Sequence, residues 1–200
     1  MTKTILDKWQ ITVEELTELV QKNPSLRGVM LGYIAEKKFQ DMFLGHPEIT
    51  SIGKTDDHDR KTKGDRYIKY KGVDVIIEVK SLQTNTVQRL ADGTFCGKTQ
   101  VDASDRRPVT LPTGEVLNTT CLVTGEFDLL AVNLFAFEDH WRFSFAKNND
   151  LPRSKWKGYT PAQQKCLLST LIEVTWPPKP PFYEDPFPLL DEIVRDRKLR

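Results

Sequence analysis

Residues 64–80 read GDRYIKYKGVDVIIEVK and form the most informative stretch of the 200-residue chain. Two runs rich in β-branched and aromatic residues flank the turn at Lys71-Gly72, and this pattern predicts a β-hairpin. The second run is apolar enough to be a central strand of a sheet. Because alternate residues of a strand face the same way, Glu78 and Lys80 should lie side by side on one face.

Two charged side chains on so apolar a strand are costly unless that end of the strand opens into a functional site. Asp65 begins the partner strand, which can bring its carboxylate across from Glu78. Two converging carboxylates suit a hard cation such as Mg²⁺, which prefers oxygen ligands and keeps several waters. Alternatively, Asp65 caps a turn, and Glu78 and Lys80 form an exposed ion pair. We favour a site made by all three residues.

The flanking sequence predicts helices before this hairpin. Thr12 and Glu15 form a capping box for a short helix that should end near Asn23-Pro24. A longer helix is expected from about Ser25 to Leu44, with Gly45 as its stop.

Further strands and two helices are expected around and after the hairpin. Thr160-Pro161 has the form of a helix start for AQQKCLLSTL, and residues 186–197 have helical spacing. This order predicts an α/β, restriction endonuclease-like mixed central β-sheet flanked by helices. The expected strands lie near Ile49 to Ile52 and at TVQRLA (86–91), TFCGKTQV (94–101), EVLNTTCLV (115–123), FDLLAVNLFAF (127–137) and WRFSFA (141–146).

Length and composition set broad limits. The length fits a single domain, with helices in about 1–45, the hairpin and sheet in 46–150, and a helix and a Pro-rich segment in 151–200. The 29 basic and 28 acidic residues give no argument for a strongly basic nucleic-acid binder. Cys96, Cys121 and Cys166 lack metal-site spacing and are interpreted as reduced thiols. Without a long apolar run, the chain is expected to be soluble and cytoplasmic, with no membrane contact.

Glu36 is an exception on the longer predicted helix. Helical stepping places it between Val29 and Phe43 and opposite Arg27, so its carboxylate points toward the apolar side. A buried carboxylate needs a partner, a proton or a metal. A structural salt bridge to an arginine and a role at a metal are equal alternatives for Glu36.

Asp65, Glu78 and Lys80 resemble the motif of the PD-(D/E)xK nuclease superfamily, which includes restriction endonucleases, Holliday-junction resolvases and repair nucleases. The resemblance implies that Asp65, Glu78 and the Val79 carbonyl bind Mg²⁺, while Lys80 orients or helps to deprotonate the attacking water. It also implies a catalytic role for Glu36, since members often add a glutamate from a preceding helix. Gly64 replaces the nominal proline of the motif.

The activity implied by the resemblance is magnesium-dependent hydrolysis of DNA phosphodiester bonds, by in-line attack of a metal-activated water. Lys80 would add positive charge where the transition state becomes more negative. We favour a type II-like restriction endonuclease that acts as a homodimer, because one small domain has one active site and a duplex has two strands. A Holliday-junction resolvase or repair nuclease, and a non-catalytic DNA-binding protein that keeps the fold, are the alternatives. Segment 176–188 is either a dimer arm or a packed connection.

Double-stranded DNA is the expected partner. Arg pairs with guanine, and Gln or Asn with adenine, in the major groove, so the polar segment 81–120 has side chains suited to reading bases. Basic residues that flank Asp65 could contact phosphates. For any single residue, an ordinary polar hairpin is the alternative. The residues predicted to bind DNA are Lys63, Arg66, Gln83, Asn85, Arg89, Lys98, Gln100, Arg106 and Arg107.

Overall fold

The computed structural model describes residues 2–54 and 64–199. The chain divides into two compact units, Met1–Ile34 and Ala35–Arg200. Helices α1 (Ile5–Trp9) and α2 (Val13–Lys22) lie in the first unit, and α3 (Pro24–Phe43) continues into the second. The structure confirms α2, with its predicted capping box, and α3; the short α1 was not predicted. The single domain inferred from length stays a prediction.

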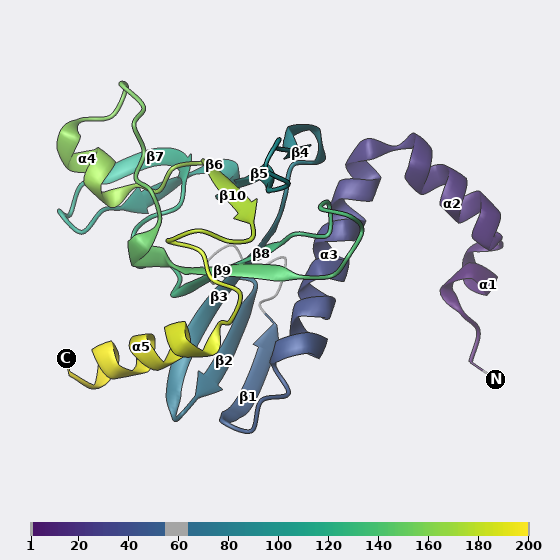
Figure 1. The fold of residues 1–200 in the computed structure, drawn as a ribbon, viewed down its shortest axis with the longest axis horizontal. Helices are drawn as coiled ribbons and strands as arrows, with labels where there is room; N and C mark the ends of the chain where they lie inside the picture. The colour runs from purple at the N-terminus through teal and green to yellow at the C-terminus, as the bar shows by residue number, and fades with distance from the viewer. Residues whose placement is uncertain (1, 55–63, 200) are drawn as a thin grey trace. The chain divides into compact units, whose positions relative to one another are not determined.

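A five-stranded mixed sheet forms the centre of the second unit (Figure 1). Its strand order is β1-β2-β3-β8-β9, and only β3 and β8 pair in parallel. The predicted hairpin is β2 with β3, and β3 has a partner strand along each edge, as its apolar sequence indicated. The strands are β1 (Ile49–Lys54), β2 (Arg66–Tyr70), β3 (Val73–Ser81), β8 (Leu129–Asn133) and β9 (Phe143–Lys147).

Helices cover one face of this sheet. The part of α3 that belongs to the second unit and α5 (Phe187–Lys198) pack there against β3 and β9. The fold class predicted from sequence, a mixed sheet flanked by helices, is therefore confirmed. Residues of this core include Phe39, Val75, Ile77, Val79, Phe143, Phe145 and Leu190.

The other face of the central sheet packs against a second core. Ile76 of β3 and Leu130 and Val132 of β8 contribute to it. Because Ile76 faces this side, strand alternation directs Glu78 and Lys80 to the same side. The two charged residues of the hairpin therefore point away from α3 and α5.

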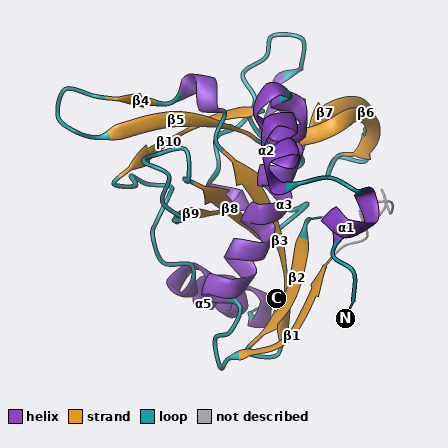
Figure 2. Ribbon diagram, turned by 90° about the vertical axis from the view of Figure 1, so that its right-hand side faces the viewer, coloured by secondary structure: helices purple, strands orange, loops and turns teal. Residues whose placement is uncertain are grey.

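Two small sheets complete the second unit (Figure 2). One has the order β10-β5-β4, and the other pairs β6 with β7. Strands β6 and β10 were not predicted: β6 is polar, and β10 begins at Leu171, the last residue of the expected helix AQQKCLLSTL. The elements are β4 (Gln88–Arg89), β5 (Phe95–Gln100), β6 (Asp102–Thr110), β7 (Val116–Cys121), β10 (Leu171–Trp176), α4 (Pro161–Cys166) and two 3-10 turns, η1 (Thr84–Thr86) and η2 (Asn148–Asp150).

Helix α4 is shorter than predicted for a physical reason. Leu167 and Leu168 are fully buried and form bridges with Val123 and Arg153. Burial of these two leucines in extended conformation outweighs the local helix propensity of the segment.

Asp128 connects β8 to β3 through hydrogen bonds and to α5 through an ion pair. Its backbone N–H donates to the Ile76 carbonyl at 2.8 Å, and its Oδ2 accepts the Ile76 N–H at 2.7 Å. Its Oδ1 lies 2.6 Å from Nη2 of Arg197 on α5. Asp128, the second residue of FDLLAV, therefore has a structural role.

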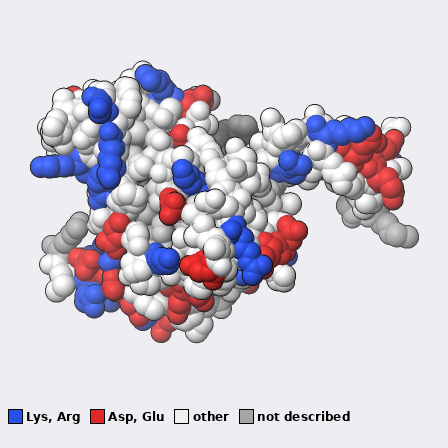
Figure 3. Space-filling model, turned by 45° about the horizontal axis from the view of Figure 1, so that its top comes forward, with Lys and Arg blue, Asp and Glu red and all other residues white. Residues whose placement is uncertain are grey.

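Other features agree with the composition. Cys96, Cys121 and Cys166 are free thiols. Within residues 2–54 and 64–199, no helix is both long and apolar enough to cross a membrane. Lys, Arg, Asp and Glu side chains share the face shown in Figure 3, as the formal net charge of +1 implies.

Candidate functional site

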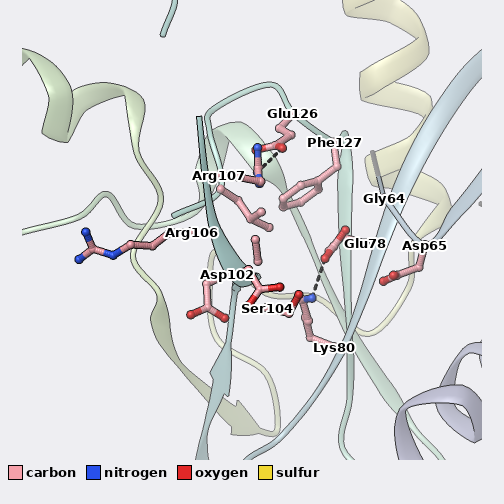
Figure 4. Close-up of a pocket in the computed structure, with 13 residues that line it drawn as sticks. Gly64, Asp65, Glu78, Lys80, Asp102, Ser104, Arg106, Arg107, Glu126 and Phe127 are labelled. Carbon is pink, nitrogen blue, oxygen red and sulfur yellow. Dashed lines mark hydrogen bonds and ion pairs between the residues drawn. The ribbon is translucent and has the colours of Figure 1, made fainter. Parts of the chain in front are cut away.

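Asp65, Glu78 and Lys80 line one pocket of about 450 Å³ (Figure 4). The backbone N–H of Asp65 donates to the Ile77 carbonyl at 2.9 Å, which places Asp65 beside Glu78. Gly64 allows this approach, because its φ is +73° and a Cβ atom there would lie 2.4 Å from Cγ2 of Ile76. The three residues of the motif therefore face the same side of the sheet.

The Asp65 carboxylate is tied to the backbone of β3. Its Oδ2 accepts the Val79 N–H at 2.7 Å. Burial raises the pKa of Asp65, although Lys80, the Val79 N–H and Arg66 all favour the charged form and oppose this rise. The hydrogen bond fixes the carboxylate at the pocket wall and brings the Val79 backbone next to it.

Glu78 and Lys80 form an ion pair, with Nζ 2.7 Å from Oε1. Burial raises the pKa of Glu78 to about 7 despite the attraction of Lys80, and the nearby negative charges of Asp65 and Glu126 add to the rise. Burial alone would lower the pKa of Lys80, but the attraction of Glu78, Asp65 and Asp102 outweighs it, so this pKa is raised. Lys80 is therefore an ammonium ion at neutral pH, next to a carboxylate that protonates easily.

Strand β6 and the loop before β8 supply further charged residues that sequence reasoning missed. Glu126 pairs with Arg107 and accepts the Val123 N–H at 2.8 Å. Asp102 begins β6 and accepts a hydrogen bond from Nε2 of Gln100 at 3.0 Å. The signals were weak: Glu126 comes shortly before a recognisable strand, while Asp102 lies within a polar segment that was not recognised as a strand.

The pocket carries more negative than positive charge. Five acidic and three basic side chains line it, namely Asp65, Glu78, Asp102, Asp105 and Glu126 against Lys80, Arg106 and Arg107. Across the described part of the chain, no three Asp, Glu, His or Cys side chains gather closely enough to hold a metal ion. Asp65 and Glu78 still fit Mg²⁺, since it often uses one or two carboxylates and keeps its other positions for water. Their raised pKa values show two buried acids that a cation would stabilise.

Glu36 and Arg66 lie elsewhere. Oε2 of Glu36 is 3.5 Å both from Nη2 of Arg66 and from Nζ of Lys54. Glu36 is not among the described residues that line the pocket. These ion pairs favour the salt-bridge alternative for Glu36 over a catalytic role.

The burial of Arg66 argues against the phosphate contact predicted for it. Along β2, residues 66, 68 and 70 are buried while Tyr67 and Lys69 are exposed. Arg66 therefore points into the interior with Ile68 and Tyr70, where it pairs with Glu36. Strand alternation predicts this inward orientation of Arg66, but the prediction of a phosphate contact did not take it into account.

The structure distributes the other predicted DNA-binding residues over two regions. Arg106 and Arg107 line the pocket. The second region is β5 with the preceding η1 and β4, where Nε2 of Gln83 donates to Oε1 of Gln100 at 2.8 Å. Lys63 lies outside the described residues. The exposed residues of the second region are Asn85, Arg89, Lys98 and Gln100.

Comparisons with known proteins give little. No family model matches the chain, and no curated protein matches it. The solved structure of a bacterial homing endonuclease, I-Ssp6803I, is similar over 68% of this chain and 85% of that one, with 16% sequence identity and a TM-score of 0.34. A similarity with so low a TM-score carries no argument about function.

Proposed function

We propose that the protein is a magnesium-dependent endonuclease that hydrolyses DNA phosphodiester bonds at the pocket of Asp65, Glu78 and Lys80. One observation supports this more than any other: adjacent strands bring two carboxylates and an amine to one face, at the end of a largely apolar strand. Such a set is costly to bury and has no apparent structural purpose. It matches the order and spacing of the motif in the sequence.

Asp65 and Glu78 are the residues that would hold Mg²⁺. Bound Mg²⁺ lowers the pKa of an attacking water and neutralises charge on the phosphate. The Val79 N–H keeps the Asp65 carboxylate oriented through its 2.7 Å hydrogen bond. The fixed position of Asp65 reduces the reorganisation needed when a cation and a phosphate enter.

Lys80 has two tasks in this proposal. Without a cation, its ammonium group offsets the charge of Glu78 at 2.7 Å. When Glu78 holds the cation instead, the ammonium group can donate to a phosphate oxygen or to the attacking water. It then stabilises the negative charge that grows on the phosphate in the transition state.

Duplex DNA is the proposed substrate, and a type II-like restriction endonuclease is the proposed kind of enzyme. Arg106 and Arg107 on the pocket wall can contact backbone phosphates, and bound Mg²⁺ would offset the excess of acidic side chains that otherwise repels a polyanion. One pocket can cut one strand at a time. A homodimer with two pockets is therefore the proposed active form.

Plasmid cleavage with Mg²⁺ tests the proposal. The wild type should cut, whereas Asp65→Ala and Lys80→Ala should not. Asp74→Asn is the matched control, because Asp74 is an exposed acid on the same strand and lies outside the pocket lining. Discrete fragments would indicate a restriction enzyme, and selective cutting of branched DNA a resolvase. Equal behaviour of the wild type and the two alanine variants would refute the catalytic assignment.

A further inference from the structure

Residues 152–160, between η2 and α4, form a loop with an unusual tip, here called the Trp156 loop. Trp156 is 58% exposed and has an exposed lysine on either side, Lys155 and Lys157. Tryptophan is highly buried on average, whereas this ring is exposed and lies between two positive charges. No residue of this loop belongs to the pocket lining or was predicted to bind DNA.

The Trp156 ring is held in place by its own loop. It meets the Tyr159 ring edge-on, with 4.6 Å between the ring centroids. It also lies against Gly158, where a Cβ atom would come within 2.3 Å of Cη2 of the indole. The Tyr159 hydroxyl is 2.6 Å from Oγ1 of Thr119 on β7, which anchors the loop to the β6–β7 hairpin. The exposed ring is therefore preorganised, which lowers the entropic cost of binding a partner.

Exposed lysines occur in this loop and on the helix that follows it. Lys165 on α4 is exposed, as are Lys155 and Lys157. Arg106 lies close enough to act on Tyr159: burial raises the pKa of the Tyr159 hydroxyl, and the charge of Arg106 opposes that rise. Arg106 also lines the pocket wall, and its side chain points away from Glu78 and Lys80 (Figure 4). Basic groups therefore occur both on the pocket wall and in the loop.

We propose that the Trp156 loop, with Lys165 and Arg106, is a second DNA-contact surface that binds the substrate backbone beside the cut site. This inference rests on the proposed function, which supplies DNA as the ligand. The lysines and Arg106 bind phosphates, which provide sequence-independent affinity. The Trp156 ring packs against the apolar face of a deoxyribose, a contact that does not depend on sequence because every nucleotide carries the same sugar. A protein partner fits less well, because lysine is depleted at protein interfaces.

Binding of a fluorescent DNA duplex without divalent metal tests this surface, since binding is then measured apart from cleavage. The double variant Lys155→Ala/Lys157→Ala should weaken binding about tenfold at moderate salt and make the salt dependence of log K shallower by about 2, one for each lost phosphate contact. The control is Arg195→Ala/Lys198→Ala, which removes two exposed charges from α5. This control should bind like the wild type.

A second pair of variants tests the ring. Gly158→Ala should displace the indole and weaken binding, whereas Gly45→Ala meets open space and should change nothing. Quenching of tryptophan fluorescence by DNA should disappear in Trp156→Leu. Thermal melts check that each variant is folded.

The outcomes separate this inference from the proposed function. If the wild type binds and cuts DNA while the loop variants bind like their controls, the Trp156 loop is not a contact surface and the nuclease proposal stands. If the wild type binds no DNA at low salt, both proposals fail. Loss of binding in the loop variants alone, with folding unchanged, supports the inference.

Discussion

The Nζ atom of Lys80 lies 2.7 Å from Oε1 of Glu78, so the amine and one carboxylate of the pocket form a mostly buried ion pair. Each residue changes the protonation of the other. Lys80 favours the charged carboxylate, while burial and the neighbouring acids disfavour it and bring the Glu78 pKa to about 7. The pocket should therefore respond to pH, to a divalent cation and to loss of either partner.

The stability of the metal-free protein should fall as pH rises through the Glu78 pKa. The folded-state pKa of about 7 lies above the ordinary value of 4.5, so the folded state binds the extra proton between these two values. The stabilisation is complete below the lower value and is lost above the higher one. Relative to Glu78→Gln, the wild type should lose at most about 3 kcal/mol across this range. Urea unfolding in EDTA at several pH values measures this difference, and parallel curves for the two proteins would contradict it.

Mg²⁺ should stabilise the folded protein against heat. A ligand that binds only the folded state increases the free energy of unfolding by RT ln(1 + [L]/Kd), and the melting temperature rises with it. The effect should vanish in Asp65→Asn and in Glu78→Gln, and it should persist in Asp74→Asn. Thermal melts with and without millimolar Mg²⁺ provide the test at mildly alkaline pH, where Glu78 is ionised. A shift that survives in both pocket variants would place the cation elsewhere.

Replacing Lys80 by Met should slow cleavage roughly 100-fold or more, because a positive charge at the transition state is lost. The same change should also affect the cation. Lys80 opposes the rise in the Glu78 pKa, so its removal raises this pKa further and leaves the carboxylate protonated to higher pH. The pH midpoint of Mg²⁺ binding should therefore move upward in Lys80→Met. A slower enzyme with an unchanged midpoint would show that Lys80 acts on the substrate alone.

The residues that the β2–β3 hairpin gives to this site could be predicted from the sequence. The residues that distant segments add to it could not. Alternation along VDVIIEVK placed Glu78 and Lys80 on one face, and the turn at Lys71-Gly72 set the register that brings Asp65 beside them. Asp102 and Glu126 reach the pocket only because β6 and the loop before β8 close over the end of β3. That closure depends on non-local strand pairing, which periodicity does not encode.

Arg66 and the segment after α4 show two further limits. Arg66 was predicted to contact phosphate because it flanks Asp65, but it pairs with Glu36, which lies on a helix thirty positions earlier. Leu167 and Leu168 continue an apparent helical pattern, yet both are buried in an extended segment. For Leu167 and Leu168, distant partners outweigh the local helical pattern, whereas for Arg66 the alternation along β2 already indicated an inward side chain.

Glu126→Ala should destabilise the fold by about 3 kcal/mol. Glu126 is mostly buried, pairs with Arg107 and accepts the Val123 N–H. Its removal therefore leaves the Arg107 charge without its partner and the Val123 N–H without its acceptor. Glu138→Ala is the control, because Glu138 is half-exposed and Arg142 keeps its hydrogen bond to the Phe137 carbonyl, so the loss should cost less than about 1 kcal/mol. Urea denaturation of the two variants measures both values. Equal costs would show that the Arg107–Glu126 pair adds nothing beyond a surface contact.

The charge of Asp102, at the start of β6, should influence the pKa of Lys80. Its charge helps to raise the Lys80 pKa, and its carboxylate is held by Gln100, which in turn accepts a hydrogen bond from Gln83. Asp102→Asn removes the charge but keeps an oxygen that can accept from Gln100, so it isolates the electrostatic effect. The Lys80 pKa should fall, and the loss of cleavage at alkaline pH should begin at lower pH than in the wild type.

A pH–rate profile of Asp102→Asn measures this shift, with the exposed Asp139→Asn as a control that should leave the profile unchanged. Gln100→Ala makes the complementary change, because it keeps the Asp102 charge and removes a side chain proposed to read adenine. This variant should alter DNA affinity or sequence preference. The pH at which cleavage is lost on the alkaline side of the profile, here called the alkaline limb, should not change. If Gln100→Ala moves the limb as far as Asp102→Asn does, the hydrogen bond rather than the charge controls Lys80. The strand predicted to read bases would then be coupled, through Asp102, to the amine proposed to act on the phosphate.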